Sequence, residues 1–162
     1  MPKLIFHRRI NIFQHENNTG TKKAVSLPIV NEPHSIYTMD NNIKKILETD
    51  TNGLLTYEYI ANNMGNIDED MSTLVDNMIL KDRTGQFVVS TARYLNAIDR
   101  EKYATSIDLL VKAAIAKDRD HVYLAYLASS LWGADYKERA AELSEQDDNF
   151  RRIYKRLYPV GI

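Results

Sequence analysis

The segment that governs the expected fold reads Leu55-Thr56-Tyr57-Glu58-Tyr59-Ile60-Ala61-Asn62-Asn63-Met64-Gly65 and continues from Asn66 to Met78. Tyr57, Ile60 and Met64 recur at positions i, i+3 and i+7, a spacing that is typical of an amphipathic helix. Thr56 is a suitable N-cap residue, and Gly65 is a suitable residue to end the helix. The segment therefore predicts a short helix that ends at a glycine-containing turn.

A second helical pattern follows that turn. Asp68, Glu69 and Asp70 are acidic, and acidic residues stabilise the N-terminus of a helix through its dipole. The apolar residues after them fall on one helical stripe: Met71, Leu74, Val75, Met78 and Ile79. The two predicted helices can bury their apolar stripes against each other.

Working outward, the residues on either side give one further helix and one strand. Ile43, Ile46 and Leu47 predict a short helix for which Asp40 is the N-cap. After a turn that ends at Gly85, the β-branched and aromatic run Gln86-Phe87-Val88-Val89-Ser90 predicts a strand.

The C-terminal part of the chain is predicted to be helical. The expected helices are Thr105–Lys117, His121–Trp132, and Ala134 to about Tyr158 with a break near residues 146–148. No self-similar segment at the period of a solenoid protein is found, so a repeat architecture is not expected.

The pattern over residues 43–89 resembles the helix-turn-helix of MarR-type winged-helix regulators. The resemblance rests on the segment quoted above together with Ser72, Leu74, Val75, Asp76 and Met78 at the positions the family uses. It implies a three-helix core with a short β-hairpin, the wing, around Arg83-Thr84-Gly85. The fold class expected is therefore mainly α, of the α+β type, with a winged-helix-like core, an N-terminal extended arm or hairpin, and C-terminal helices.

The first 40 residues differ in composition from the rest. Prolines, a glycine and strand-like apolar runs predict an extended arm or a hairpin there, in which Ile5, Ile10 and Phe13 would dock on a partner. The expected organisation is a single domain over residues 1–162. Its parts are the arm (1–40), the winged-helix-like region (41–98) and a helical layer (99–162).

The composition excludes several classes of protein. The chain holds 21 basic and 22 acidic residues, so no overall field attracts it to nucleic acid or to an anionic membrane. It contains no cysteine, and its first ten residues lack an apolar signal core. The longest strongly apolar stretch, residues 122–132, is too short to span a bilayer, which needs about 20 residues. The expected location is the cytoplasm or the interior of a virus particle, without secretion or membrane contact.

No motif for catalysis or cofactor binding is present. The histidines, His7, His15, His34 and His121, lack the spacing of a metal site, and no phosphate-binding or dinucleotide-binding glycine loop occurs. Ser129 and Ser130 lack the glycine-rich context of a hydrolase nucleophile. The expectation is a protein that is not an enzyme, with no catalytic residues, no cofactor and no metal.

The charges of the helix-turn-helix argue against DNA as its partner. The N-terminal residues of a recognition helix approach the bases, and here three of them are acidic. The leading hypothesis is an adaptor that binds protein through the arm and this acidic face. Its expected partner-binding residues are Asp68, Glu69, Asp70, Ser72, Thr73, Ile5, Ile10 and Phe13.

Two alternatives stay open. A DNA-binding regulator would contact phosphates through Arg83 and the basic C-terminal helix residues Arg151, Arg152, Lys155 and Arg156. A structural or assembly subunit, for example of a viral particle, would dock on a neighbour or on a copy of itself through its N-terminal arm. The C-terminal half also holds aromatic residues of a class that recurs at protein interfaces, although most are expected in or near the core: Tyr123, Tyr126, Tyr154, Tyr158 and Trp132.

Overall fold

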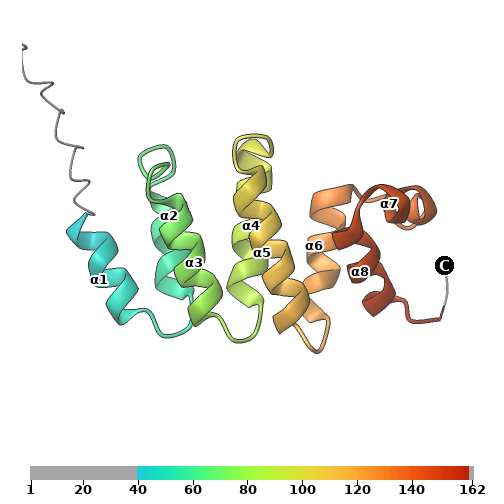
Figure 1. The fold of residues 1–162 in the computed structure, drawn as a ribbon, viewed down its shortest axis with the longest axis horizontal. Coiled ribbons are helices and arrows are strands. Elements are labelled where there is room, and N and C mark those ends of the chain that lie inside the picture. The colour runs from blue at the N-terminus through green and yellow to red at the C-terminus, as the bar shows by residue number, and fades with distance from the viewer. Residues whose placement is uncertain (1–39, 161–162) are drawn as a thin grey trace, which may run out of the picture. The chain divides into compact units, whose positions relative to one another are not determined.

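The computed structural model describes residues 40–160, and these residues form helices and no β-strand (Figure 1). The helices are α1 (Asn41–Thr49), α2 (Leu54–Asn62), α3 (Met71–Lys81), α4 (Gln86–Asp99), α5 (Ala104–Lys117), α6 (Val122–Trp132), α7 (Ala140–Gln146) and α8 (Asp148–Leu157). The chain over this range is therefore built from helix–helix packing alone.

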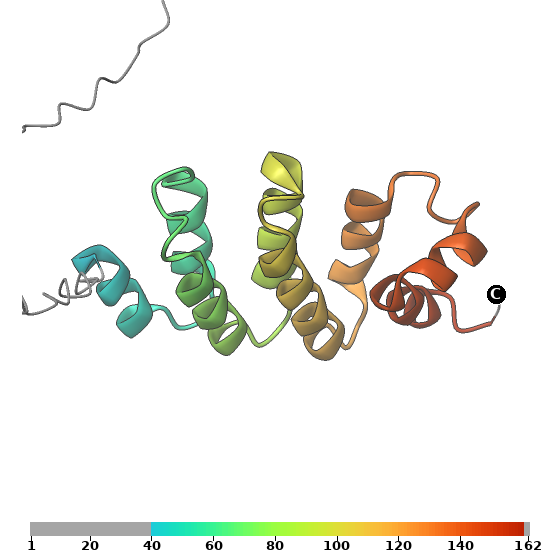
Figure 2. The same cartoon turned by 45° about the horizontal axis from the view of Figure 1, so that its top comes forward.

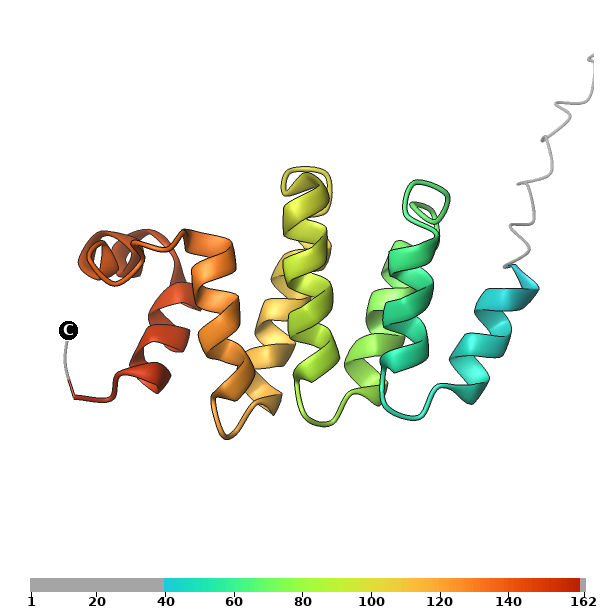
Figure 3. The same ribbon diagram turned by 180° about the vertical axis from the view of Figure 1, so that it is seen from behind.

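The described helices stand side by side in a row of two layers. Viewed from behind, α2, α4 and α6 form the near layer, and α3 and α5 lie behind them (Figure 3). The contacts agree, since α4 packs on both α2 and α6, while α5 packs on both α3 and α8. The row is also visible after rotation in Figure 2. Each pair, α2 with α3 and α4 with α5, is a helical hairpin that stacks on the next one.

A buried aspartate recurs between successive hairpins. Asp50, Asp82 and Asp118 directly follow α1, α3 and α5, and each is almost fully buried, with at most 2% of its surface exposed. Each carboxylate accepts hydrogen bonds from backbone N–H groups at the start of the next helix, which would otherwise lack acceptors. The donors and distances are Gly53 (2.8 Å) and Thr56 (3.0 Å) for Asp50, Gly85 (3.0 Å), Phe87 (2.8 Å) and Val88 (2.9 Å) for Asp82, and Tyr123 (2.7 Å) and Leu124 (2.8 Å) for Asp118.

The ionised state of Asp50 is favoured by these contacts. Burial alone raises the pKa of Asp50, but hydrogen bonds from the Thr56 hydroxyl and from the backbone of Thr56, Gly53 and Asn52 outweigh it. The pKa of this carboxyl is therefore lowered from its ordinary value of 3.8. The same turn thus places a charged acceptor at the start of a helix while burying it.

The third residue after each aspartate adopts the left-handed backbone conformation. Gly53, Gly85 and His121 have φ values of 94°, 90° and 61°. A Cβ atom on Gly53 would lie 3.2 Å from Cβ of Asp82, and one on Gly85 would lie 3.2 Å from Cβ of Asp118. Each turn therefore packs directly on the aspartate of the next turn, and at the first two turns the third residue has to be glycine.

The third turn offers a direct test of this arrangement. His121 is the only non-glycine residue with positive φ in the described part of the chain, and this conformation costs an L-residue about 1 kcal/mol. Replacing His121 with glycine removes that cost, and the greater freedom of the unfolded chain offsets part of the gain. We expect His121→Gly to raise the free energy of unfolding by about 0.5 kcal/mol in urea denaturation.

The matched control introduces glycine within the helix that follows. Ala125 is exposed in α6, so Ala125→Gly should lower the free energy of unfolding by about 1 kcal/mol. Destabilisation by His121→Gly would show that the imidazole makes contacts worth more than the backbone strain.

The predicted α+β fold class is wrong, because no β-hairpin forms. Residues 86–90, predicted as a strand, are the first turn of α4. Asp82 supplies the acceptors that start this helix, and the buried residues Val88, Ala92 and Leu95 continue with helical spacing. The turn predicted as the wing, Arg83-Thr84-Gly85, is instead the connection between α3 and α4.

Two further expectations need correction. The predicted absence of a repeat is wrong, since the same Asp turn and helical hairpin recur after 32 residues (Asp50 to Asp82) and after 36 (Asp82 to Asp118). Thr56 is not the N-cap of α2, which begins at Leu54. Its side chain is buried, donating to Asp50 at 2.5 Å and accepting from Asn77 at 2.8 Å. The helix capped by Asp40 and the break near residues 146–148 are confirmed.

Candidate functional site

A series of aromatic side chains lies across the layer formed by α2, α4 and α6. The Tyr57 and Phe87 rings are 6.3 Å apart, and Arg93 lies 5.9 Å from the ring centre of Tyr126. Tyr57, Ser90, Arg93 and Tyr94 together line a hollow of about 290 Å³. We call this surface the aromatic face; it comprises Tyr57, Phe87, Ser90, Arg93, Tyr94, Tyr123 and Tyr126.

This layer exposes several large apolar side chains, and α3 and α5 each expose one, Leu80 and Leu109. Tyr126 and Val122 expose 60% and 53% of their surface, although both belong to α6, whose opposite side enters the core. Leu54, Leu55 and Ile98 on α2 and α4 are also exposed. Helix α6 contains no charged residue, whereas α8 in the other layer carries four basic ones. Exposed aromatic and apolar side chains on a helix without charged residues are a common property of interaction surfaces.

Hydrogen bonds between helices fix the spacing of this layer. The Tyr94 hydroxyl donates to the carbonyl of Ala61 at 3.1 Å, which joins α4 to α2. The Asn96 amide donates to the carbonyl of Ser130 at 3.0 Å, which joins α4 to α6. The aromatic face is therefore carried by rigid helices, which lowers the entropy lost when a partner binds.

Arg93 is the one basic side chain on α2, α4 and α6, and it is held in place. Its Nε donates to the Ser130 hydroxyl at 2.8 Å, and its guanidinium packs on Tyr126. Among the residues that the structure describes, no acceptor engages its two terminal amino groups. A planar, fixed guanidinium with donors to spare is suited to bind a carboxylate or a carbonyl of a partner.

The acidic residues predicted to bind a partner lie together at the connection between α2 and α3. Asp68, Glu69 and Asp70, with Gly65 and Asn66, line a hollow of about 240 Å³. Ser72 is exposed and Thr73 is half-buried in the first turn of α3. The structure thus brings this part of the predicted set together.

The charge of that acidic cluster is partly neutralised within the fold. Asp68 accepts hydrogen bonds from the Lys102 ammonium at 2.6 Å and the Tyr103 hydroxyl at 2.8 Å, and these lower the pKa of Asp68. Asp70 is 7% exposed, so its carboxylate faces the protein more than the solvent. Among the described residues, Glu69 is the one exposed acid of the three that forms no ion pair, so the acidic face is smaller than the sequence indicates.

The basic residues predicted for nucleic acid do not form one free patch. Arg156 donates to the carbonyl of Ile115, and Arg151 pairs with Asp148. Arg152 and Lys155 are exposed on α8. Arg83 lies away from them on the chain, in the turn between α3 and α4.

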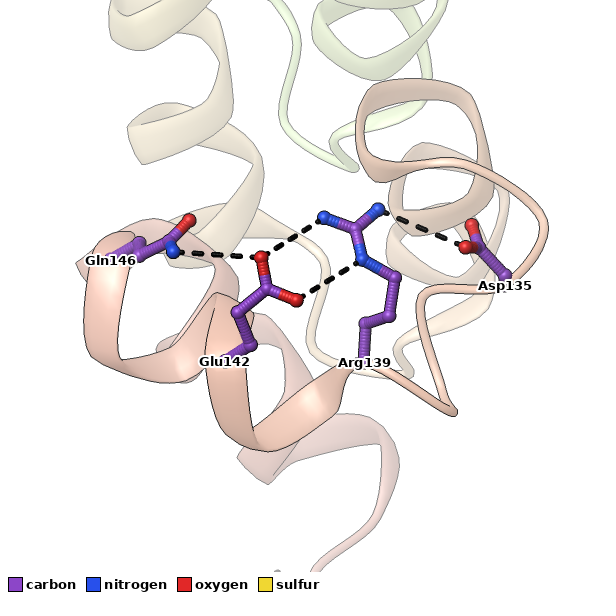
Figure 4. Close-up of polar contacts among 4 residues, drawn as sticks. All are labelled: Asp135, Arg139, Glu142 and Gln146. Atoms are coloured by element: carbon purple, nitrogen blue, oxygen red, sulfur yellow. Dashed lines mark hydrogen bonds and ion pairs between the residues drawn. The ribbon is translucent and has the colours of Figure 1, made fainter.

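An exposed polar network surrounds the start of α7 (Figure 4). The Arg139 guanidinium lies 3.4 Å from the Glu142 carboxylate and 3.8 Å from that of Asp135, and Gln146 donates to Glu142 at 3.5 Å. Exposed pairs of this kind contribute little to stability, because solvent and salt screen them. We interpret the network as local support for the connection between α6 and α7, without a ligand of its own.

The remaining predicted features concern the N-terminal arm, metal binding and the membrane. Ile5, Ile10 and Phe13, the predicted contacts of the arm, lie outside the described residues. Over residues 40–160 no cluster of three or more metal-binding side chains occurs. Within the same range, every helix is too short or too polar to cross a bilayer.

Comparisons with protein families, with curated proteins and with solved structures give no match for this chain. Residues 40–160 form an α-helical repeat, a stack of helical hairpins joined by capped turns.

The aromatic face is not among the predicted site residues. Tyr123 and Tyr126 belong to the interface-type aromatic residues named above, most of which were expected in or near the core. The pattern predicts an apolar helical stripe for Tyr57 and a strand for residues 86–90. The missing signal was the recurrence of the Asp turn, which places the helices that carry these residues in one layer.

Proposed function

We propose that this chain is a non-enzymatic protein-binding scaffold and that its partner docks on the aromatic face. The observation that carries the proposal is the group of exposed Val122, Tyr126 and Arg93 side chains beside half-buried tyrosine rings on one layer of the helical stack. Repeat proteins of this type use the extended surface of stacked units to bind partners. A turn followed by two helices at a period of about 33 residues is also the unit of ankyrin repeats, which this stack resembles.

The residue types on the aromatic face support this function. Tyr and Arg are enriched among the residues that carry most of the binding energy at protein interfaces. Tyr57, Tyr94 and Tyr126 each combine a large apolar ring with a polar end, and helix packing restricts their movement. The proposal replaces the arm and the acidic residues as the main contact surface with α2, α4 and α6.

The test compares the two layers of the stack. The measurement is the amount of each protein that the immobilised chain captures from an extract of its source. We expect the double variant Tyr126→Ser, Val122→Ser to lose the proteins that the wild-type chain captures, because the interface would lose the apolar area of both side chains. The control is Leu80→Ser, which removes an apolar side chain on α3 that is 75% exposed. Captured proteins that depend on Leu80 and tolerate the α6 changes would contradict the proposed surface.

A further inference from the structure

Two of the contacts that cross the seam between α4 and α6 lie at equal register on the two helices. Near the start of both helices, the Tyr123 hydroxyl donates to the Gln86 side chain at 3.5 Å. Seven residues later on each helix, Arg93 donates to the Ser130 hydroxyl at 2.8 Å. Seven helical residues span about 10 Å, which is the length of roughly three residues of extended chain. The seam therefore presents two positions at a spacing that suits an extended peptide.

One basic side chain lies at the Arg93–Ser130 position of the seam, and three line a hollow near the Tyr123–Gln86 position. At the Arg93–Ser130 position, the hydrogen bond from Nε holds Arg93 in place. No described residue accepts a hydrogen bond from its terminal amino groups. Near the Tyr123–Gln86 position, a hollow of about 530 Å³ lies between the turn that follows α3 and the turn that follows α5. Its lining includes Arg83, Lys117 and Arg119 together with Tyr123.

The acidic residues that line this hollow offset only part of the positive charge of its three basic residues. Asp118 lines it, but its carboxylate accepts the N–H groups of Tyr123 and Leu124 at the start of α6. Asp120 is the other acid of the lining, so three basic groups face one acid that does not cap a helix. The chain as a whole has a net charge of −1, which makes this local positive seam a departure from the average surface.

From this charge pattern we infer that the partner is recognised through an acidic, extended peptide segment that lies along the α4–α6 seam. One of its carboxylates would bind Arg93 beside Tyr126, and another, about three residues away, would lie in the hollow lined by Arg83, Lys117 and Arg119. Apolar side chains between them would contact Val122 and Tyr126. This inference rests on the proposed function, because it names the chemistry of the partner for the same surface.

The aromatic rings and the short spacing favour a peptide over a nucleic acid. Nucleic-acid affinity depends on many phosphate contacts, and the seam supplies four basic side chains next to an uncharged helix. A carboxylate held between a fixed guanidinium and tyrosine rings gains charge-assisted hydrogen bonds in a partly dry environment. Duplex DNA is therefore the alternative that the experiment has to exclude.

The test is selection of random 12-residue peptides displayed on phage against the full chain. We expect enrichment of peptides with acidic residues three apart. The strongest of them, as a labelled synthetic peptide, should lose about tenfold or more in affinity for Arg93→Gln. Arg93→Lys keeps the charge without the planar fork and should recover part of the loss. The matched control, Arg152→Gln, removes an exposed arginine from α8 and should bind as the wild type does.

The outcomes distinguish failure of the inferred peptide chemistry from failure of the proposed binding face. Selected peptides without acidic enrichment, lost in the Tyr126→Ser, Val122→Ser double variant, would overturn the inferred chemistry and keep the protein-binding face. Selected peptides that tolerate this double variant, or no enrichment at all, would overturn both. Tight binding of labelled duplex DNA that falls with Arg93→Gln would replace the peptide with a nucleic acid. Circular dichroism of each variant shows whether the fold is intact.

Discussion

Replacing Asp82 with alanine is expected to lower the free energy of unfolding by about 3 kcal/mol. The Asp82 carboxylate is 1% exposed and accepts five hydrogen bonds, from the backbone of Thr84, Gly85, Phe87 and Val88 and from the Thr84 hydroxyl. Alanine removes all of these acceptors and leaves the donors at the start of α4 without partners in a site that admits little water. Urea denaturation followed by circular dichroism measures the change.

The alanine variant isolates the carboxylate from the packing of the turn. The Cβ atom of Asp82 remains, so the contact that it makes with the turn at Gly53 is kept. The control is Asp76→Ala, an exposed acid on α3, for which a change within about 0.5 kcal/mol is expected. A loss below about 1 kcal/mol for Asp82→Ala would mean that water replaces the carboxylate and that the turn does not depend on it.

The positions of most helices follow from the sequence because the apolar spacing is local information. Ile43, Ile46 and Leu47 indicated α1, and the stripe from Met71 to Ile79 indicated α3, since both helices bury a single face. The break between α7 and α8 was also indicated, because Asp147 accepts the N–H groups of Asn149 and Phe150 and so starts a new helix.

The start of α4 was predicted wrongly because tertiary contacts override local preference there. Phe87, Val88 and Val89 favour a strand when they are considered alone. In the structure Val88 and Val89 are buried within a helix, and Asp82, four residues before the helix begins, provides the cap. A wider window that included Ala92 and Leu95 would have shown the helical period.

The repeat was missed because few residue identities define it. The recurring signal is an aspartate followed three residues later by a left-handed position, and at the third turn that position is His121 in place of glycine. The spacing also differs between copies, since α2 and α4 have 9 and 14 residues. Only the stacking of the turns shows that Asp50, Asp82 and Asp118 have the same role.

The candidate site depended on this repeat and so was only partly predictable. Tyrosines are visible in the sequence, but nothing local shows that Tyr57, Arg93 and Tyr126 lie on three helices of one layer. Conversely, Arg156 reads as part of a basic face and yet donates to a backbone carbonyl of α5. Charge and aromatic patterns along the sequence therefore do not show which side chains meet on one surface.

Phe150→Ala is expected to have the largest effect on stability, a loss of about 4 kcal/mol. The ring of Phe150 is fully buried, and its centre lies 5.1 Å from that of Trp132, 5.6 Å from that of Tyr154 and 6.3 Å from that of Tyr136. Truncation leaves a cavity among rigid aromatic rings that cannot close around it, so both the transfer energy and the packing energy are lost.

Each unit of a helical stack contacts mainly its neighbours. The C-terminal helices around Phe150 should therefore unfold before the rest of the stack in this variant. Trp132 is the single tryptophan and donates to Asp147 at 3.0 Å, so its fluorescence reports on the C-terminal end, whereas circular dichroism reports on every helix. In Phe150→Ala the fluorescence transition should occur at lower urea than the circular dichroism transition, and the two should coincide in Tyr126→Ala, which removes an exposed ring. Coincident transitions in Phe150→Ala would show instead that the described helices unfold as one cooperative unit, with the capped turns coupling the C-terminal helices to α2.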